Sequence, residues 1–315
     1  MSPSDGLADT SGRSAALQIA ITGSSGLIGR AVTSFLQNRG HRVHAIVRTP
    51  PTEHQIGWRP DAGHIDGKRL EGLDAIIHLA GENIADRRWT QAQMTRIQAS
   101  RVVGTDLLAR TLAGLDRPPK TLLSASAIGY YGDAGDRLLD ETADAGTGFL
   151  AELGQAWEDA TRPAAGAGIR VAVLRTGVVL SPAGGALAKM LPIFRTGLAG
   201  PLGSGRQWMS WISLDDAVGA IHHLLLGDSS GPVNLVAPTP VTNAEFTRTL
   251  ASILRRPAFL PVPALALRIA VGRLADEALL ASARVHPGRL LEQGYAFHHP
   301  TLREALLHVL ERQTH

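Results

Sequence analysis

Residues 21–32 read "ITGSSGLIGRAV", and this stretch decides the fold. Three glycines, Gly23, Gly26 and Gly29, stand three residues apart between an apolar run and a helical pattern. Glycines at the first two places let the backbone turn tightly beside a pyrophosphate, and the third lets helix and sheet pack closely. The N-terminus of the helix offers N–H groups and the positive end of its dipole to the phosphates. The stretch therefore predicts a strand, a phosphate-binding loop and a helix of a dinucleotide-binding fold.

The sequence around this stretch alternates short apolar runs with longer helical patterns, which indicates βαβ units and a parallel sheet. Strands are expected at residues 17–22, 42–47, 55–58, 74–80, 121–126, 170–179 and 232–237, and helices at residues 27–39, 90–115 and 148–159. The fold class is thus α/β: a Rossmann-type doubly wound parallel sheet with a smaller, mostly helical C-terminal lobe. We expect a disordered tail at residues 1–15, the Rossmann domain at residues 16–180 with later returns to the sheet, and the lobe, interwoven with it, at residues 181–315.

The composition excludes several classes of function. The 31 basic and 28 acidic residues leave a net charge of +3 without a basic run, so no nucleic-acid partner is expected. Since the chain has no cysteine, it has no disulfide, thiol nucleophile or thiolate metal site. The 12 histidines are scattered rather than spaced as ligands, so no metal site is expected. No run of about 18 apolar residues occurs, so we expect no membrane-spanning helix. We expect a cytoplasmic protein, and the sequence does not indicate its oligomeric state.

The residue after the second strand favours NADP over NAD. An NAD site usually carries an acidic residue there, which accepts hydrogen bonds from the adenosine ribose. Here the place is held by Arg48, whose guanidinium can bind a 2′-phosphate bidentately, and Arg30 is a second candidate for this phosphate. Small residues in "HLAG" (residues 78–81) let the cofactor cross the carboxyl edge of the sheet. The expected cofactor-binding residues are Gly23, Ser24, Ser25, Gly26, Leu27, Ile28, Gly29, Arg48, Leu79, Ala80, Gly81 and Ser124.

Several motifs resemble the extended short-chain dehydrogenase/reductase family, the group of NAD-dependent epimerases and dehydratases. They are the glycine loop, "IHLAG" (77–81), "SASAIGYYG" (124–132) and "SWISLDDAV" (210–218). Three further motifs look like the YfcH-like epimerase-family proteins, an atypical branch with a characteristic C-terminal domain: "LAGENIADRRWT" (79–90), "FLAELGQAWE" (149–158) and "VHPGRLLEQGYAFHHPTLREAL" (285–306). The resemblance, which starts near residue 17, implies that the backbone of Thr176, Gly177 and Val178 lies beside the nicotinamide.

The resemblance breaks at the acid/base pair of that family. Its members carry a tyrosine and, four residues later, a lysine on the helix after the 121–126 strand, while a serine of that strand orients the substrate oxygen. Carried over by position, the serine is Ser126, but the tyrosine falls on Phe149 and the lysine on Leu153, neither of which can transfer a proton. No Tyr-x-x-x-Lys exists in the chain, because the residues four places after Tyr130, Tyr131 and Tyr295 are Ala134, Gly135 and His299.

Polar residues near the same sheet edge are candidates to replace this pair. Ser126 with Tyr131 or Tyr130 could orient a carbonyl, although a tyrosine with a pKa of about 10 and no lysine exchanges protons slowly at neutral pH. The candidates for binding the substrate are Glu82, Arg175 and Arg206. Trp211 and Asp215 are expected to serve the structure instead, by packing between the lobes and by capping a helix.

Two functions are compatible with these features. The first is an NADP(H)-binding oxidoreductase or epimerase-like enzyme with a non-standard proton relay, acting on an unknown small molecule. The alternative is a non-catalytic NADP(H)-binding sensor or regulatory protein, which the missing acid/base pair favours.

Overall fold

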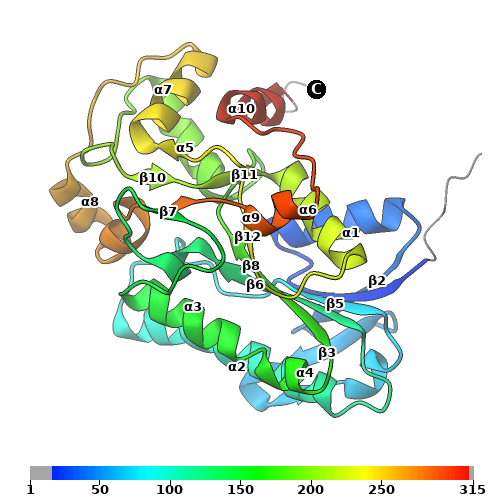
Figure 1. Ribbon diagram of the computed structural model, residues 1–315. Helices are drawn as coiled ribbons and strands as arrows, with labels where there is room; N and C mark the ends of the chain where they lie inside the picture. The colour runs from blue at the N-terminus through cyan, green and yellow to red at the C-terminus, as the bar shows by residue number, and fades with distance from the viewer. Residues whose placement is uncertain (1–15, 312–315) are drawn as a thin grey trace, which may run out of the picture.

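The computed structural model describes residues 16–311 of the chain. Its centre is an eight-stranded sheet in the order β12-β8-β6-β5-β1-β2-β3-β4, in which all neighbours are parallel except β3 and β4 (Figure 1). The strands are β1 (Gln18–Thr22), β2 (Arg42–Val47), β3 (Gln55–Arg59), β4 (His64–Ile65), β5 (Ala75–His78), β6 (Thr121–Ala127), β8 (Arg170–Thr176) and β12 (Gly231–Leu235). The strand order reverses between β1 and β5, and such a reversal opens a crevice at the carboxyl ends of the strands. The doubly wound fold predicted from the sequence is confirmed.

Helices cover both faces of the sheet. On one face lie α1 (Leu27–Asn38) and α6 (Leu214–Leu226), and on the other lie α2 (Gln91–Ala113), α3 (Phe149–Asp159) and α4 (Arg162–Gly166) (Figure 1). The alternation within β1 shows why both faces are filled: Ile19 and Ile21 belong to the core under α1 and α6, whereas Ala20 belongs to the core under α2. The sheet is therefore buried on both sides, and only its ends are available to a ligand.

The C-terminal lobe has a third core, whose buried residues come from 180–251 and 302–309. Its strands are β9 (Val178–Leu180), β10 (Trp208–Met209), β11 (Trp211–Ser213) and β13 (Val241–Thr242), and its helices are α5 (Gly185–Thr196), α7 (Asn243–Leu254), α8 (Ala264–Val271), α9 (Gly288–Glu292) and α10 (Leu302–Glu311). The shorter elements are η1 (Pro60–Ala62), η2 (Gly67–Leu70), η3 (Ile128–Tyr131), η4 (Ala275–Leu279), β7 (Leu138–Leu139) and β14 (Arg284–Val285). No helix among residues 16–311 is long and apolar enough to cross a bilayer. Although α6 and β12 follow residue 180, they belong to the sheet layers, and the domain boundary itself stays a prediction.

The strand expected at residues 170–179 is divided in two. It ends as β8 at Thr176 and restarts as β9, which leaves the main sheet and pairs with β11 instead. Gly177 makes the break, because its N–H donates to Leu235 O while the N–H of Val178 donates to Ser210 O. A Cβ on Gly177 would lie 2.6 Å from the Ser210 oxygen. The apolar run is continuous in sequence, but the chain passes from the main sheet to a second sheet within it, at the point where the two lobes meet.

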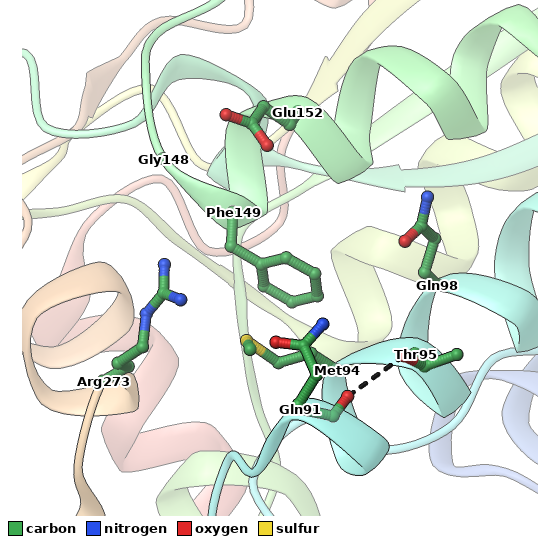
Figure 2. A pocket seen from close by; sticks show the side chains of 8 residues that line it. All are labelled: Gln91, Met94, Thr95, Gln98, Gly148, Phe149, Glu152 and Arg273. Carbon is green, nitrogen blue, oxygen red and sulfur yellow. Dashed lines mark hydrogen bonds between the residues drawn. The ribbon is translucent and has the colours of Figure 1, made fainter.

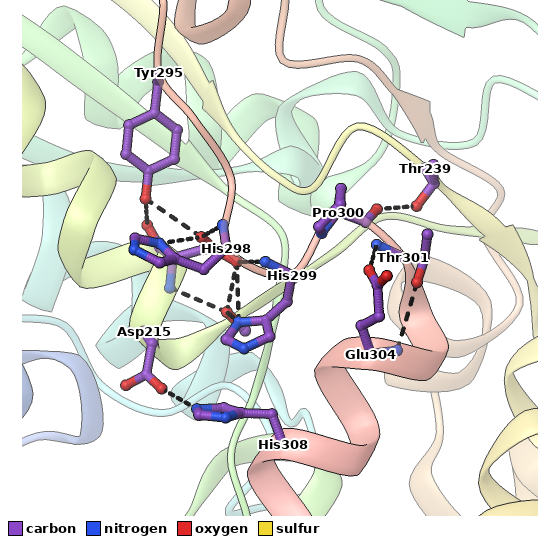
Figure 3. A network of polar contacts seen from close by, with 11 residues as sticks. Asp215, Thr239, Tyr295, His298, His299, Pro300, Thr301, Glu304 and His308 are labelled. Carbon is purple, nitrogen blue, oxygen red and sulfur yellow. Dashed lines mark hydrogen bonds and ion pairs between the residues drawn. The ribbon is translucent and has the colours of Figure 1, made fainter.

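A buried carboxylate holds the C-terminal segment against α6. Asp216, which is fully buried, accepts hydrogen bonds from the backbone amides of His298 (2.7 Å) and His299 (3.0 Å) (Figure 3). The side chain that caps α6 is Ser213, so the expectation that Asp215 caps this helix is wrong. Asp215 pairs instead with His308 of α10, 2.5 Å away. These contacts fix α10 and the segment before it against α6.

Candidate functional site

The glycine loop joins β1 to α1 at the reversal of strand order. Its first and last glycines are packed so closely against backbone atoms that no Cβ fits there. Gly23 has a φ of +67°, and a Cβ there would lie 2.8 Å from the Leu79 carbonyl carbon. A Cβ on Gly29 would lie 2.1 Å from the Gly23 oxygen. Gly26 caps α1 without a side-chain hydrogen bond, and no acidic residue stands in the first turn. The amides of that turn can therefore bind a pyrophosphate, so the loop fits a dinucleotide.

The end of β2 presents positive charge beside this loop. Arg48 directly follows β2, which is the parallel neighbour of β1, and its side chain is exposed. Within residues 16–311 its guanidinium has no ion pair or hydrogen bond. Arg30, near the start of α1, is exposed as well. The adenosine end of the crevice thus carries cations and no carboxylate at the place that would accept bonds from an unphosphorylated ribose.

A buried histidine that the sequence analysis overlooked fixes the next segment of the crevice. His78 Nδ1 lies 2.7 Å from Thr22 Oγ1, and its Nε2 lies 2.9 Å from Thr105 Oγ1. The same Thr22 oxygen accepts the backbone amides of Leu79 and Ala80, each at 3.1 Å. Complete burial lowers the pKa of His78 to about 4, so the ring is neutral at physiological pH. This chain of contacts holds the "HLAG" backbone in place across β1, β5 and α2.

A cavity of about 590 Å³ continues from the glycine loop along the carboxyl edge of the sheet. Its wall is mostly apolar and is shared by the strand ends, α3, α5 and the segment around η4. The predicted residues that line it are Gly23, Gly26, Leu27, Ile28, Gly29, Leu79, Ser126, Thr176, Gly177 and Val178. The predicted residues outside this lining are Ser24, Ser25, Arg48, Ala80, Gly81, Ser124, Glu82, Tyr130, Tyr131, Arg175 and Arg206. The cavity thus joins the nucleotide loop to Ser126.

Ser126 is bonded to a carboxylate that the sequence analysis did not identify. Its Oγ donates to Oε1 of Glu158, on the last turn of α3, at 2.8 Å. Arg175, which stands opposite Ser126 in the β6–β8 register, binds the same carboxylate bidentately at 2.8 and 2.9 Å. The Arg175 side chain is 4% exposed and the Glu158 side chain 14%. This ion pair occupies Arg175, so its expected role in binding substrate is not supported by the geometry.

Tyr131 belongs to the same network and faces away from the cavity. Its hydroxyl donates to Asn234 Oδ1 at 2.7 Å and accepts from Arg175 Nη1 at 3.0 Å. Burial raises the pKa of Tyr131 to about 12, which opposes loss of its proton. The Arg175 Cζ lies over the ring of Tyr130, 3.5 Å from the ring centroid. Both tyrosines therefore support the ion pair, and we do not retain them as proton donors.

The face of α3 that borders the cavity carries no acid or base. It consists of Leu150, Leu153, Gly154 and Trp157, and the Trp157 indole N–H is already bonded to Thr105. Phe149, where the sequence placed the missing tyrosine, lines a separate cavity of about 300 Å³ beside Met94 of α2 and Arg273 (Figure 2). Leu153, at the expected position of the lysine, does border the larger cavity, whereas Phe149 does not. The conclusion that this helix lacks the acid/base pair is unaffected.

The remaining candidates lie apart from Ser126. Glu82 accepts a hydrogen bond from Gln93 at 2.7 Å, and Arg206 is exposed. The Ser124 hydroxyl is fully buried and has no partner among the described residues. Trp211 was expected to pack between the lobes, but it is buried in the core of the C-terminal lobe, where its N–H donates to Thr239 O. Between residues 16 and 311 no three His, Asp or Glu side chains converge as metal ligands.

Comparisons with known proteins agree with this geometry. Residues 19–236 match the model of the NAD dependent epimerase/dehydratase family, and residues 262–309 match a domain of unknown function, DUF1731. An epimerase family protein of Mycobacterium bovis, Mb2239, is 49% identical over 91% of this chain and 96% of its own length. The mouse epimerase family protein SDR39U1 is 38% identical over 93% of this chain and 100% of its own length.

Solved structures agree as well. The crystal structure of human epimerase family protein SDR39U1 with NADPH has a TM-score of 0.87 and 36% identity, covering 93% of this chain and 99% of that one. A nucleoside-diphosphate sugar epimerase from Corynebacterium glutamicum has a TM-score of 0.77 and 38% identity, covering 94% of this chain and 58% of that one. This chain therefore belongs to the NAD dependent epimerase/dehydratase family, and it is an NAD(P)-binding protein of that family.

Proposed function

We propose that this member of the family is an NADP(H)-dependent oxidoreductase that acts on a small, largely apolar carbonyl or alcohol. The observation that carries the proposal is the cavity itself, which runs from the glycine loop to the Ser126 hydroxyl and has a mostly apolar wall. A nucleotide sugar needs many hydrogen-bonding groups, and this wall offers few. An epimerase-like cycle of oxidation and reduction would use the same site, but the lining favours an apolar substrate.

The preference for the phosphorylated cofactor rests on Arg48. This exposed guanidinium stands at the end of β2 without a protein partner in the described chain, beside the strand that leads into the glycine loop. It can form a bidentate pair with a 2′-phosphate, and it cannot accept a hydrogen bond from a ribose hydroxyl. A relative solved with NADPH supports the same preference.

The residues of the chain itself transfer the proton of the reaction. A bound NADP cofactor supplies or accepts a hydride at its nicotinamide ring. In the oxidative direction, Ser126 Oγ accepts the proton of the substrate alcohol while its own proton passes to Glu158, 2.8 Å away. In the reductive direction the two transfers reverse, and the carbonyl oxygen receives the Ser126 proton. Arg175 positions the carboxylate through two bonds, so Ser126 and Glu158 replace the missing tyrosine and lysine.

The test is NADPH consumption with a panel of apolar aldehydes, ketones and quinones. Ser126→Ala should lower kcat/KM on any substrate found by about 100-fold or more, the usual contribution of a positioned proton donor. Ser229→Ala is the matched control, because Ser229 is also a buried serine but lies at the opposite end of β12 from the cavity. An active Ser126→Ala protein would contradict the relay. Consumption by no member of the panel would contradict the proposed activity.

A second function, cofactor-dependent regulation without catalysis, is favoured by the apolar face of α3. Leu150, Leu153, Gly154 and Trp157 give that helix no ionisable group toward the cavity. A protein of this kind binds NADPH tightly and turns over nothing in the panel. Its cofactor should then change a partner-binding or hydrodynamic property, which sedimentation with and without NADPH measures.

A further inference from the structure

Arg101 is a half-buried cation that faces the large cavity from helix α2. It lines that cavity together with Leu153 and Trp157 of α3. Its guanidinium lies over the Trp157 ring, with Cζ 4.9 Å from the ring centroid. The lack of a side chain on Gly81 makes room for it, because a Cβ there would lie 3.3 Å from Arg101 Cζ. The guanidinium therefore stands where "HLAG", α2 and α3 meet.

Most hydrogen-bond donors of this guanidinium have no acceptor. Nη1 makes two long contacts, to Ile97 O at 3.3 Å and to Ser100 Oγ at 3.5 Å. In the described part of the chain Arg101 forms no ion pair, and the nearby carboxylate of Glu82 is bonded to Gln93. Burial lowers the pKa of Arg101 to about 10, which still leaves it charged at neutral pH. A desolvated cation with free donors is costly unless a ligand supplies the acceptors.

The sheet order shows which part of the cofactor reaches this point. A pyrophosphate held by the loop after β1 would leave the adenosine on the β2 side, where Arg48 stands. β5 is the neighbour of β1 on the opposite side. In that placement the nicotinamide half would pass over the end of β5 to reach Ser126 on β6. Gly81 and Arg101 lie on that path, between the pyrophosphate loop and the serine.

We propose that Arg101 binds the ribose on the nicotinamide side of the cofactor and so supplies, from α2, the cation that α3 lacks. The inference rests on the proposed function. It explains how the chain holds the nicotinamide half without a lysine on α3, since the guanidinium donors that have no acceptor in the protein can bind the ribose hydroxyls. The ring of Trp157 stabilises the cation, since Arg101 Cζ lies over it.

The experiment compares two ligands by calorimetry: NADPH and adenosine 2′,5′-bisphosphate, which lacks the nicotinamide half. Arg101→Met should weaken NADPH binding by about tenfold or more, because hydrogen bonds from a charged donor are lost, and should leave adenosine bisphosphate unchanged. Arg110→Met on the same helix is the matched control, since Arg110 is exposed and pairs only with Asp106, and should change neither affinity. Arg48→Ala should weaken both ligands.

Two results would overturn the inference: Arg101→Met protein that binds NADPH like the unaltered chain, or one that loses both ligands equally. If Arg101→Met does not yield folded protein, Arg101→Lys answers the same question. Lysine keeps the charge but lacks the planar set of N–H donors of the guanidinium. NADPH binding should therefore weaken several-fold, while adenosine bisphosphate binding stays constant. Unchanged NADPH affinity in Arg101→Lys would also overturn it. Failure of the unaltered chain to bind NADPH would instead reject the proposed function.

Discussion

The glycine loop and the start of α3 lie at the same edge of the same sheet, yet they differ in what they leave open. At the loop, α1 begins at Leu27 with no side chain bonded to its first amides. At α3, the amide of Leu150 is bonded to Glu277 of η4 at 2.8 Å, so the C-terminal lobe already occupies that helix end. The loop presents backbone amides to a ligand, whereas the α3 region presents side chains. One function can therefore be lost while the other stays intact.

We expect the largest effect on stability from a change to the buried ion pair between Glu158 of α3 and Arg175. Glu158→Gln leaves the Arg175 cation unpaired inside the protein, which should lower the free energy of unfolding by about 3–5 kcal/mol. Urea unfolding measures the change. Asp159→Asn is the matched control, because the neighbouring Asp159 is 56% exposed and pairs with a surface arginine, so it should cost less than about 1 kcal/mol. Equal effects of the two changes would show that the Ser126 network has no special role in stability.

The glycine loop should be nearly as sensitive, for steric reasons. Gly29→Ala places a methyl group 2.1 Å from a backbone oxygen, so it should cost about 3 kcal/mol and abolish NADPH binding. Thermal unfolding and calorimetry measure the two effects. Gly166→Ala, at the end of α4 with no atom within 4 Å of the new Cβ, should change neither. A Gly29→Ala protein that still bound NADPH would break the distinction between the two regions.

His78 gives a smaller effect that depends on pH. Its folded pKa of about 4 lies below the ordinary value of 6.5, so the folded state resists protonation. The associated stability is fully present above pH 6.5 and is lost as the pH falls toward 4; between pH 7.5 and pH 5 the loss should be about 2 kcal/mol. Urea unfolding of the unaltered chain and of His78→Gln, each at the two pH values, measures this loss of stability. A variant with the same pH dependence as the unaltered chain would contradict the assignment.

The sequence predicted the parts of the molecule that depend on local patterns. Glycine spacing identified the loop, and the apolar alternation identified the sheet and the helices around it. It could not reveal Glu158, because the partner of Ser126 is brought there by the packing of α3 on β6, 32 residues away along the chain. Nor could it distinguish Arg101 from Arg96 and Arg110 on the same helix, since only the packing of α2 against α3 buries one of the three.

Two errors also have a physical cause. The apolar run at residues 170–179 does not show that Gly177 transfers the chain from one sheet to another. Helical spacing alone cannot fix the rotation of α3: Leu153 borders the larger cavity as expected, but Phe149 borders the smaller one. The strand break and the position of Phe149 both depend on tertiary contacts with the C-terminal lobe, which local sequence patterns do not contain.

The most direct test of the central claim, an intact NADP(H) site beside a helix without its acid/base pair, is calorimetric titration with NADPH and NADH. The unaltered chain should bind NADPH about tenfold more tightly than NADH, and Arg48→Ala should remove that difference. Arg42→Ala is the matched control, because Arg42 is also exposed but stands at the opposite end of β2. Equal affinity for the two cofactors in the unaltered chain, or binding of neither, would contradict the account.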